Sequence, residues 1–151
     1  DKDPAYIVSL LLDKAEAGFL LQNQDGYVTC QAAAEELMKL DPQNGGGYLW
    51  YGALFMGQTK GVEALDKAVT LLKGPAKGQA YVFRADSNLR LKNYPKAKED
   101  LDHFEQEFPG HKFKPIADRL RAQWEKEKDT PPPPGSQGGS TPGSGGAGDG
   151  K

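Results

Sequence analysis

Apolar residues recur at helical spacing in seven segments of this chain. Val62, Leu65, Ala68, Val69 and Leu72, for example, follow the three-to-four-residue step of an amphipathic helix. This spacing, read with the caps and breakers that flank it, predicts helices over residues 4–22, 27–40, 48–56, 62–72, 79–91, 95–108 and 115–128. No segment is predicted to be a strand, so the predicted fold class is all-α.

Local signals set the expected helix ends. Asp3 is the expected N-cap of the first helix, with Pro4 at its first position. Residues 23–26 are expected to form a turn, and residues 45–47, all glycine, a flexible link. In the last segment Ile116, Leu120 and Trp124 form an apolar stripe. Arg121 and Glu125 there are expected to form a surface ion pair.

Small residues repeat with a period of 33 or 34 residues, and each is followed 12 positions later by a second small residue. Small side chains are needed where the two helices of a hairpin touch, so the period predicts an array of helical hairpins. Prolines recur with the same period. The landmarks are Gly18 with Cys30, Gly52 with Ala64, Ala85 with Ala97, and Pro42, Pro75 and Pro109.

These positions resemble the tetratricopeptide repeat, whose pattern is W-x2-L-G-x2-Y, then A-x3-F, then P. The resemblance covers residues 11–111, and the chain departs from the pattern at Lys14, Arg84 and Asn88. Such departures are expected to reflect either an unusual groove or a divergent repeat. The matching residues are Gly18, Tyr27, Cys30, Ala34, Leu37 and Pro42, then Tyr48, Tyr51, Gly52, Phe55, Ala64, Ala68, Leu71 and Pro75, then Tyr81, Ala85, Tyr94, Ala97, Leu101, Phe104 and Pro109.

The resemblance implies a right-handed α-α superhelix of three hairpins with a C-terminal capping helix. It also implies a concave face that binds a segment of a partner protein. Trp50, Phe83 and Phe19 would be hot spots there, although the same three rings could instead be core between repeats. The residues assigned to the concave face by resemblance are Phe19, Gln22, Asn23, Leu49, Trp50, Ala53, Met56, Val82, Phe83, Asp86, Leu89 and Arg90.

The expected domain comprises residues 1–129, with repeats at 11–44, 45–77 and 78–111 and the capping helix at 115–128. Residues 130–151 are rich in Pro, Gly and Ser and have almost nothing to bury, so a disordered tail is expected. The tail could be a native spacer or an artificial extension. The first residue is Asp, which suggests that an upstream segment has been removed, either a targeting peptide or part of an engineered sequence.

Charge and hydropathy exclude two partner classes. The net charge is −2, with 19 basic and 21 acidic residues interspersed, so no nucleic-acid footprint is present. The longest apolar run, residues 7–12, is far shorter than the about 20 residues that span a bilayer. The expected partner is therefore a protein or peptide segment.

Catalytic chemistry has little support in the sequence. His103 and His111 lack the spacing that places two metal ligands on one helix face. Cys30 occupies a position that requires a small side chain, so inert packing is expected. Glycines 45–47 lack the Lys-Ser/Thr that a phosphate loop needs. We expect no enzyme activity, no cofactor and no metal.

The sequence thus predicts a noncatalytic interaction scaffold. The segment HFEQEFPGHKF resembles bacterial envelope-assembly repeat proteins, which favours an extracytoplasmic location, and a cytoplasmic secretion-type chaperone is the alternative. A different class, a self-associating structural oligomer, also fits. Tyr6, Ile7, Leu10 and Leu11 offer it a spare hydrophobic stripe.

Overall fold

The computed structural model describes residues 3–131, and these residues form seven α-helices with no strand. The predicted all-α class is therefore confirmed for the described residues. Most of the tail predicted at 130–151 lies outside them. The helices are α1 (Pro4–Leu20), α2 (Gln24–Leu40), α3 (Gly45–Leu54), α4 (Thr59–Leu71), α5 (Pro75–Arg90), α6 (Tyr94–Glu107) and α7 (Lys114–Glu127).

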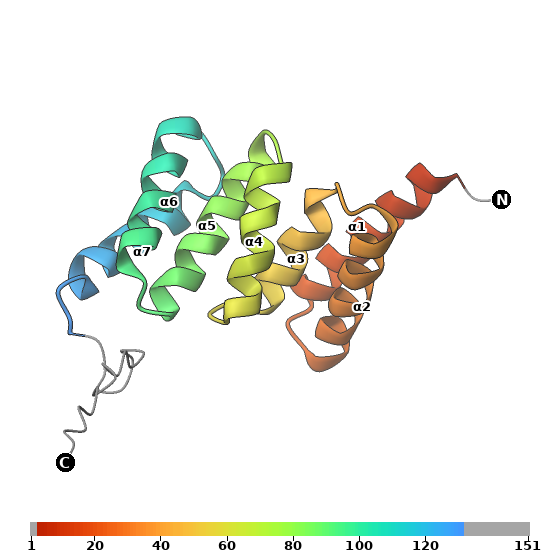
Figure 1. The fold of residues 1–151 in the computed structure, drawn as a ribbon, viewed down its shortest axis with the longest axis horizontal. Helices are drawn as coiled ribbons and strands as arrows, with labels where there is room; N and C mark the ends of the chain where they lie inside the picture. The colour runs from red at the N-terminus through yellow and green to blue at the C-terminus, as the bar shows by residue number, and fades with distance from the viewer. Residues whose placement is uncertain (1–2, 132–151) are drawn as a thin grey trace, which may run out of the picture.

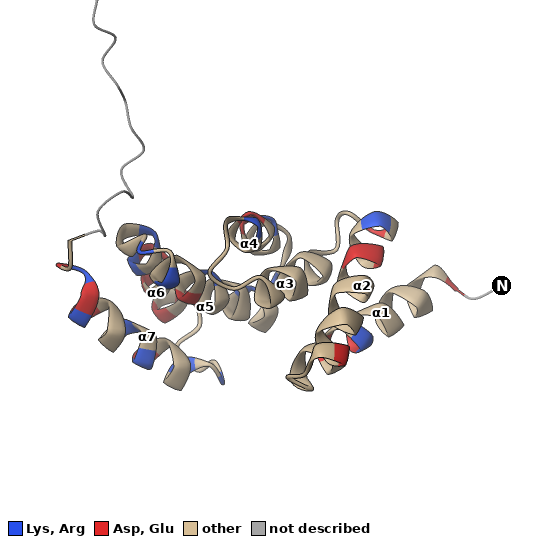
Figure 2. Cartoon of the chain, turned by 90° about the horizontal axis from the view of Figure 1, so that it is seen from below, with Lys and Arg blue, Asp and Glu red and all other residues tan. Residues whose placement is uncertain are grey.

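The helices pack in sequential pairs, α1 with α2, α3 with α4 and α5 with α6 (Figure 1). Each pair also contacts the next, and α1, α3, α5 and α7 touch in succession. Seen from below, the row is bent, with α4 on the outer side of α3 and both ends on the other side (Figure 2). No helix within residues 3–131 has the length and apolarity to cross a membrane.

Small residues lie where paired helices come closest, as the period predicts. A Cβ atom added at Gly18 would lie 2.6 Å from the carbonyl oxygen of Gly26 and 2.8 Å from the backbone nitrogen of Cys30. In the second pair, a Cβ at Gly52 would clash with Leu65. In the first pair the backbones, and in the second pair the α3 backbone and the Leu65 side chain, approach too closely for a larger side chain at Gly18 or Gly52.

The glycine run at 45–47 is not a flexible link, so that prediction is wrong. All three glycines are buried in the first turn of α3, where the Asn44 side chain accepts a hydrogen bond from the Gly46 N–H at 2.9 Å. A Cβ on Gly45 would lie 2.6 Å from Leu72 Cγ, and one on Gly47 3.1 Å from Met38 Cγ. Glycine is used here for close packing between helices and not for mobility.

The turn predicted at 23–26 is also wrong. Asn23 is instead the N-cap of α2, and its side chain accepts from the Gly26 N–H at 2.8 Å. The first helix ends earlier than predicted because Gln22 adopts a positive φ of 50°. Asp3 caps α1 as predicted, accepting from the Ala5 N–H at 3.0 Å.

α7 covers the last pair through the predicted stripe, with Leu120 and Trp124 buried. The Trp124 indole N–H donates to the carbonyl of Tyr94 at 2.9 Å, which ties α7 to α6. The predicted Arg121–Glu125 pair is wrong. Arg121 reaches back to α6 instead and pairs with Asp102 at 2.7 Å and Glu105 at 3.1 Å, because α6 lies alongside α7.

Candidate functional site

A cluster of aromatic rings joins α1, α3 and α5. The ring centroids of Phe19 and Trp50 are 5.6 Å apart, and each lies 6.4 Å from that of Phe83, so the three rings form a triangle. Phe113, just before α7, adjoins this cluster at 5.9 Å from Phe83. The fold therefore joins the three aromatic residues assigned to the concave face and adds a fourth that the sequence analysis did not identify.

The other residues assigned to that face differ in burial. Trp50 is only 6% exposed, and Leu49, Ala53, Val82 and Leu89 are buried with it. These five side chains belong to the core between helix pairs, where they offer a partner almost no surface. Phe19, Met56, Phe83 and Asp86 are partly exposed, and Gln22, Asn23 and Arg90 are exposed.

Three of the polar side chains assigned to the concave face have structural partners. Asn23 caps α2 through its side-chain oxygen. Arg90 Nε donates to Asp86 Oδ1 at 2.9 Å, one helical turn away on α5. The accessible part of the predicted face thus combines partly exposed aromatic and Met side chains with one Arg–Asp pair.

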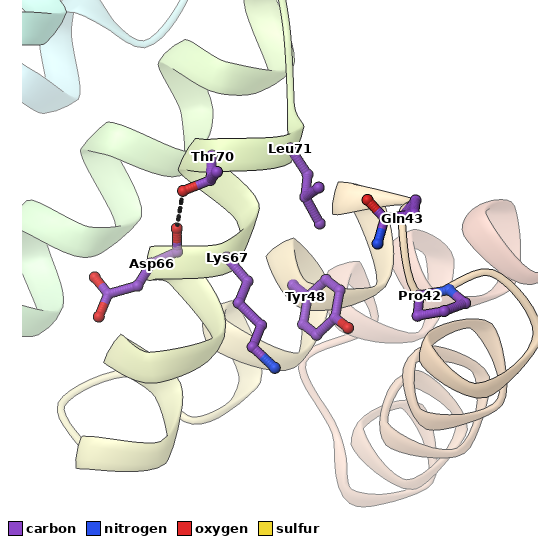
Figure 3. Close-up of a pocket in the computed structure, with 7 residues that line it drawn as sticks. All are labelled: Pro42, Gln43, Tyr48, Asp66, Lys67, Thr70 and Leu71. Carbon is purple, nitrogen blue, oxygen red and sulfur yellow. Dashed lines mark hydrogen bonds between the residues drawn. The ribbon is translucent and has the colours of Figure 1, made fainter.

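A concavity lies on the outer side of α3, beside α4, and the sequence analysis missed it. It has a volume of about 450 Å³ and opens between α4 and the segment that joins α2 to α3 (Figure 3). The Tyr48 ring and the Leu71 side chain face one another across it. Its lining comprises Pro42, Gln43, Tyr48, Asp66, Lys67, Thr70 and Leu71.

An adjoining depression of about 430 Å³ shares Tyr48 and Lys67 with this concavity and extends it along α4 to Lys60. We call the two together the α3–α4 trough. The Lys67 ammonium lies 5.2 Å from the Tyr48 ring centroid, and that of Lys60 lies 3.7 Å from the Phe55 ring. The spacing of Lys60 and Lys67, seven residues apart on α4, was a signal available in the sequence.

Arg84, one of the departures from the repeat pattern, forms a buried ion-pair cluster. Its guanidinium binds the Asp100 carboxylate through both Nε and Nη2, at 2.6–3.1 Å, and Asp66 at 2.8 Å. Burial raises the pKa of Asp100, and the hydrogen bonds from Arg84 oppose that rise. The cluster ties α5 to α6 and α4, which is a structural role.

Cys30 is fully buried between α1 and α2. Burial raises the pKa of its thiol to about 11, so the thiol stays protonated at neutral pH. Its sulfur lies 4.0 Å from the Trp50 carbonyl oxygen. A protonated thiol without access to solvent is a poor nucleophile, in keeping with inert packing.

The two histidines have separate environments. His111 Nε2 donates to the Pro75 carbonyl at 2.7 Å, and its Nδ1 accepts from the Phe113 N–H at 2.9 Å. His103 stacks on Tyr81 with a centroid separation of 5.4 Å. Within residues 3–131 no group of three His, Cys, Asp or Glu side chains has a geometry that could hold a metal ion.

Comparisons with known proteins identify no relative. No family model matches the chain, and neither a curated protein nor a solved structure matches it.

Proposed function

We propose that this protein is a noncatalytic interaction scaffold of the tetratricopeptide type, a right-handed superhelix of three hairpins that binds a partner segment along its concave face. The observation that carries the proposal is the aromatic cluster formed by Phe19, Trp50, Phe83 and Phe113. Because its rings come from α1, α3, α5 and the start of α7, the cluster offers one ligand, such as a peptide, apolar contacts from several helices. Aromatic rings in rigid surroundings supply the contacts that dominate protein interfaces.

Rigidity is the physical basis of the proposed binding. Trp50 is buried in the core and packs against the rings of Phe19 and Phe83. Its side chain is therefore already ordered before the ligand binds. The entropic cost of binding then falls mostly on the peptide. Met56 adds an adaptable apolar contact, and the Asp86–Arg90 pair supplies polar contacts at the rim.

The test is to select peptides from a random phage-displayed library and then to measure the affinity of synthetic versions of the selected peptides. Trp50→Ala is a poor probe, because removing a buried Trp costs about 3–5 kcal/mol of stability. The double variant Met56→Glu, Arg90→Glu changes accessible positions only. We expect it to weaken binding by about tenfold or more, the equivalent of losing about 1.4 kcal/mol.

The matched control is Lys67→Glu, a charge reversal in the α3–α4 trough, and we expect it to retain wild-type affinity. Circular dichroism would verify that both variants are folded. If Lys67→Glu abolished binding while the double variant retained it, the trough would be the peptide site and the proposed concave site would be wrong. Failure to enrich any peptide would argue against the scaffold function itself.

A further inference from the structure

Exposed apolar side chains are concentrated on the first helix pair. Seven of the eight large hydrophobic residues that are exposed within residues 3–131 lie between Tyr6 and Leu40, and Leu91 is the other. Single exposed apolar residues are normal on a protein surface, but a concentration of this kind marks an interaction surface.

Part of this concentration lies on one face of α1. Tyr6, Leu10, Ala17 and Leu21 are separated by four, seven and four residues, so they share one side of the helix. We call them the α1 outer stripe. Tyr6 is 56% exposed and Leu10 45% exposed. A different set of α1 side chains, including Leu12 and Phe19, contacts α3.

A shallow groove of about 240 Å³ lies beside the stripe, between α1 and α2, lined by Leu11, Lys14, Val28, Thr29, Ala32, Ala33 and Glu36. Elsewhere in the row, the surface offered by one pair is covered by a helix of the next. α3 contacts both α1 and α2, and α5 contacts both α3 and α4. A further helix is therefore the shape that suits the outer side of the first pair.

The net charge of the first helix pair indicates what kind of helix would bind to it. Residues 3–41 carry seven carboxylates and only two lysines. All the ion pairs within the described residues involve Asp66 or positions C-terminal to it, so Asp13, Glu16 and Glu36 have no cationic partner there. A second copy of this acidic surface would be repelled, whereas a basic helix would be attracted.

From the stripe, the groove and the charge together, we propose that the outer side of the first helix pair binds a cationic amphipathic helix of a partner protein. The apolar face of that helix lies on Leu10 and Ala17, and its lysines or arginines meet the carboxylates that flank the stripe. This surface is distinct from the concave face, so the two proposals succeed or fail independently.

The test uses a labelled synthetic helix of Leu and Lys, with Leu at i, i+3, i+4 and i+7, and a counterpart in which every Lys is replaced by Glu. Fluorescence anisotropy at low salt measures the affinity of each probe for the full chain. We expect the Lys probe to bind, the Glu probe not to bind, and added salt to weaken the complex.

Three variants locate the binding surface. Leu10→Glu introduces a charge into the stripe and should weaken the Lys probe by about tenfold or more. Lys14→Glu replaces a cation of α1 by a carboxylate and should strengthen binding of the Lys probe by about threefold. Leu91→Glu makes the same exposed Leu-to-Glu change at the end of α5 and should leave the affinity unchanged.

The opposite results would overturn the proposal. Equal effects of Leu10→Glu and Leu91→Glu would show that the probe only senses the net acidity of the protein. Equal binding of the Glu probe would remove the charge argument. A dimer that light scattering detects and Leu10→Glu disrupts, without probe binding, would assign the stripe to a second copy of this chain.

Discussion

The first and third helix pairs are stabilised by different means. α1 and α2 are joined through the backbone contact at Gly18, Gly26 and Cys30, and no ion pair within the described residues supports them. α5 and α6 are joined by the buried Arg84–Asp100 pair, with Asp66 of α4 as a third member. The same helix-pair architecture thus rests on close apolar contact at one end and on a polar network at the other.

The difference has a consequence for the surface. The polar network of the C-terminal half lies beneath a charged exterior, whereas the first pair exposes Leu and Tyr side chains. In an array of repeats, a terminal unit needs a polar outer face to remain soluble, and α7 meets that condition better than α1. This contrast supports the proposal that a partner helix binds at the N-terminal end.

The largest expected effect comes from removing a member of the buried pair. Asp100→Ala leaves the Arg84 guanidinium without its buried partner and should reduce the free energy of unfolding by about 3–5 kcal/mol. Asp66 is 56% exposed, so Asp66→Ala should cost about 1 kcal/mol or less. Urea denaturation of both variants measures the contrast. Similar losses of unfolding free energy in the two variants would contradict the claim that the buried Arg84–Asp100 ion pair stabilises the third helix pair.

The next effect concerns the close contact of the first pair. Gly18→Ala places a Cβ against backbone atoms of α2 and should destabilise the protein by about 1–3 kcal/mol. The matched change in the third pair, Ala85→Gly, only removes a methyl group and weakens a helix, at about 1 kcal/mol. Thermal unfolding compares the two. A stabilising Gly18→Ala would refute the close-approach argument.

Cys30 in the first helix pair should make the free energy of unfolding depend on pH in the alkaline range. Its pKa is raised from 9.0 to about 11, so its contribution to stability is complete below pH 9 and declines as the pH rises towards 11. The decline should be about 1.4 kcal/mol per pH unit. Cys30→Ala should remove this part of the slope in urea titrations at several pH values. An unchanged slope would contradict the assignment.

The smallest effect is that of salt on the surface ion pairs. Raising the salt concentration to about 1 M should reduce the protection of α6 and α7 by about 1 kcal/mol or less, because Arg121, Asp102 and Glu105 are partly solvated. α1 and α2, which take part in no ion pair within residues 3–131, should not lose protection. Residue-resolved hydrogen exchange tests this. Equal losses at both ends would contradict the comparison.

Features governed by neighbours in the sequence were predictable. The helical character, the cap at Asp3 and the small residues at helix contacts all follow from local spacing or a short repeat. The glycine run was misread because a glycine in isolation favours flexibility, and only the approach of Leu72 and Met38 makes glycine necessary at the start of α3. Likewise Arg84 gains its role from carboxylates on two other helices.

The candidate sites divide in the same way. The aromatic positions of the proposed concave face were assigned from the repeat, but how much of each ring is exposed depends on the neighbouring pair, which buries Trp50 and leaves Phe83 partly exposed. For the α3–α4 trough the sequence offered only the spacing of Lys60 and Lys67, because the lining residues, which lie between 38 and 71, are brought together only by the fold.

Periodicity within each helix was enough to specify that the described chain is helical, and the repeat of small residues was enough to specify where paired helices touch. Which aromatic rings stay accessible, which charges are paired and which face of α1 is exposed follow only from the packing of residues 3–131. These properties depend on neighbouring helix pairs, because burial and ion pairing arise only when surfaces distant in the chain meet.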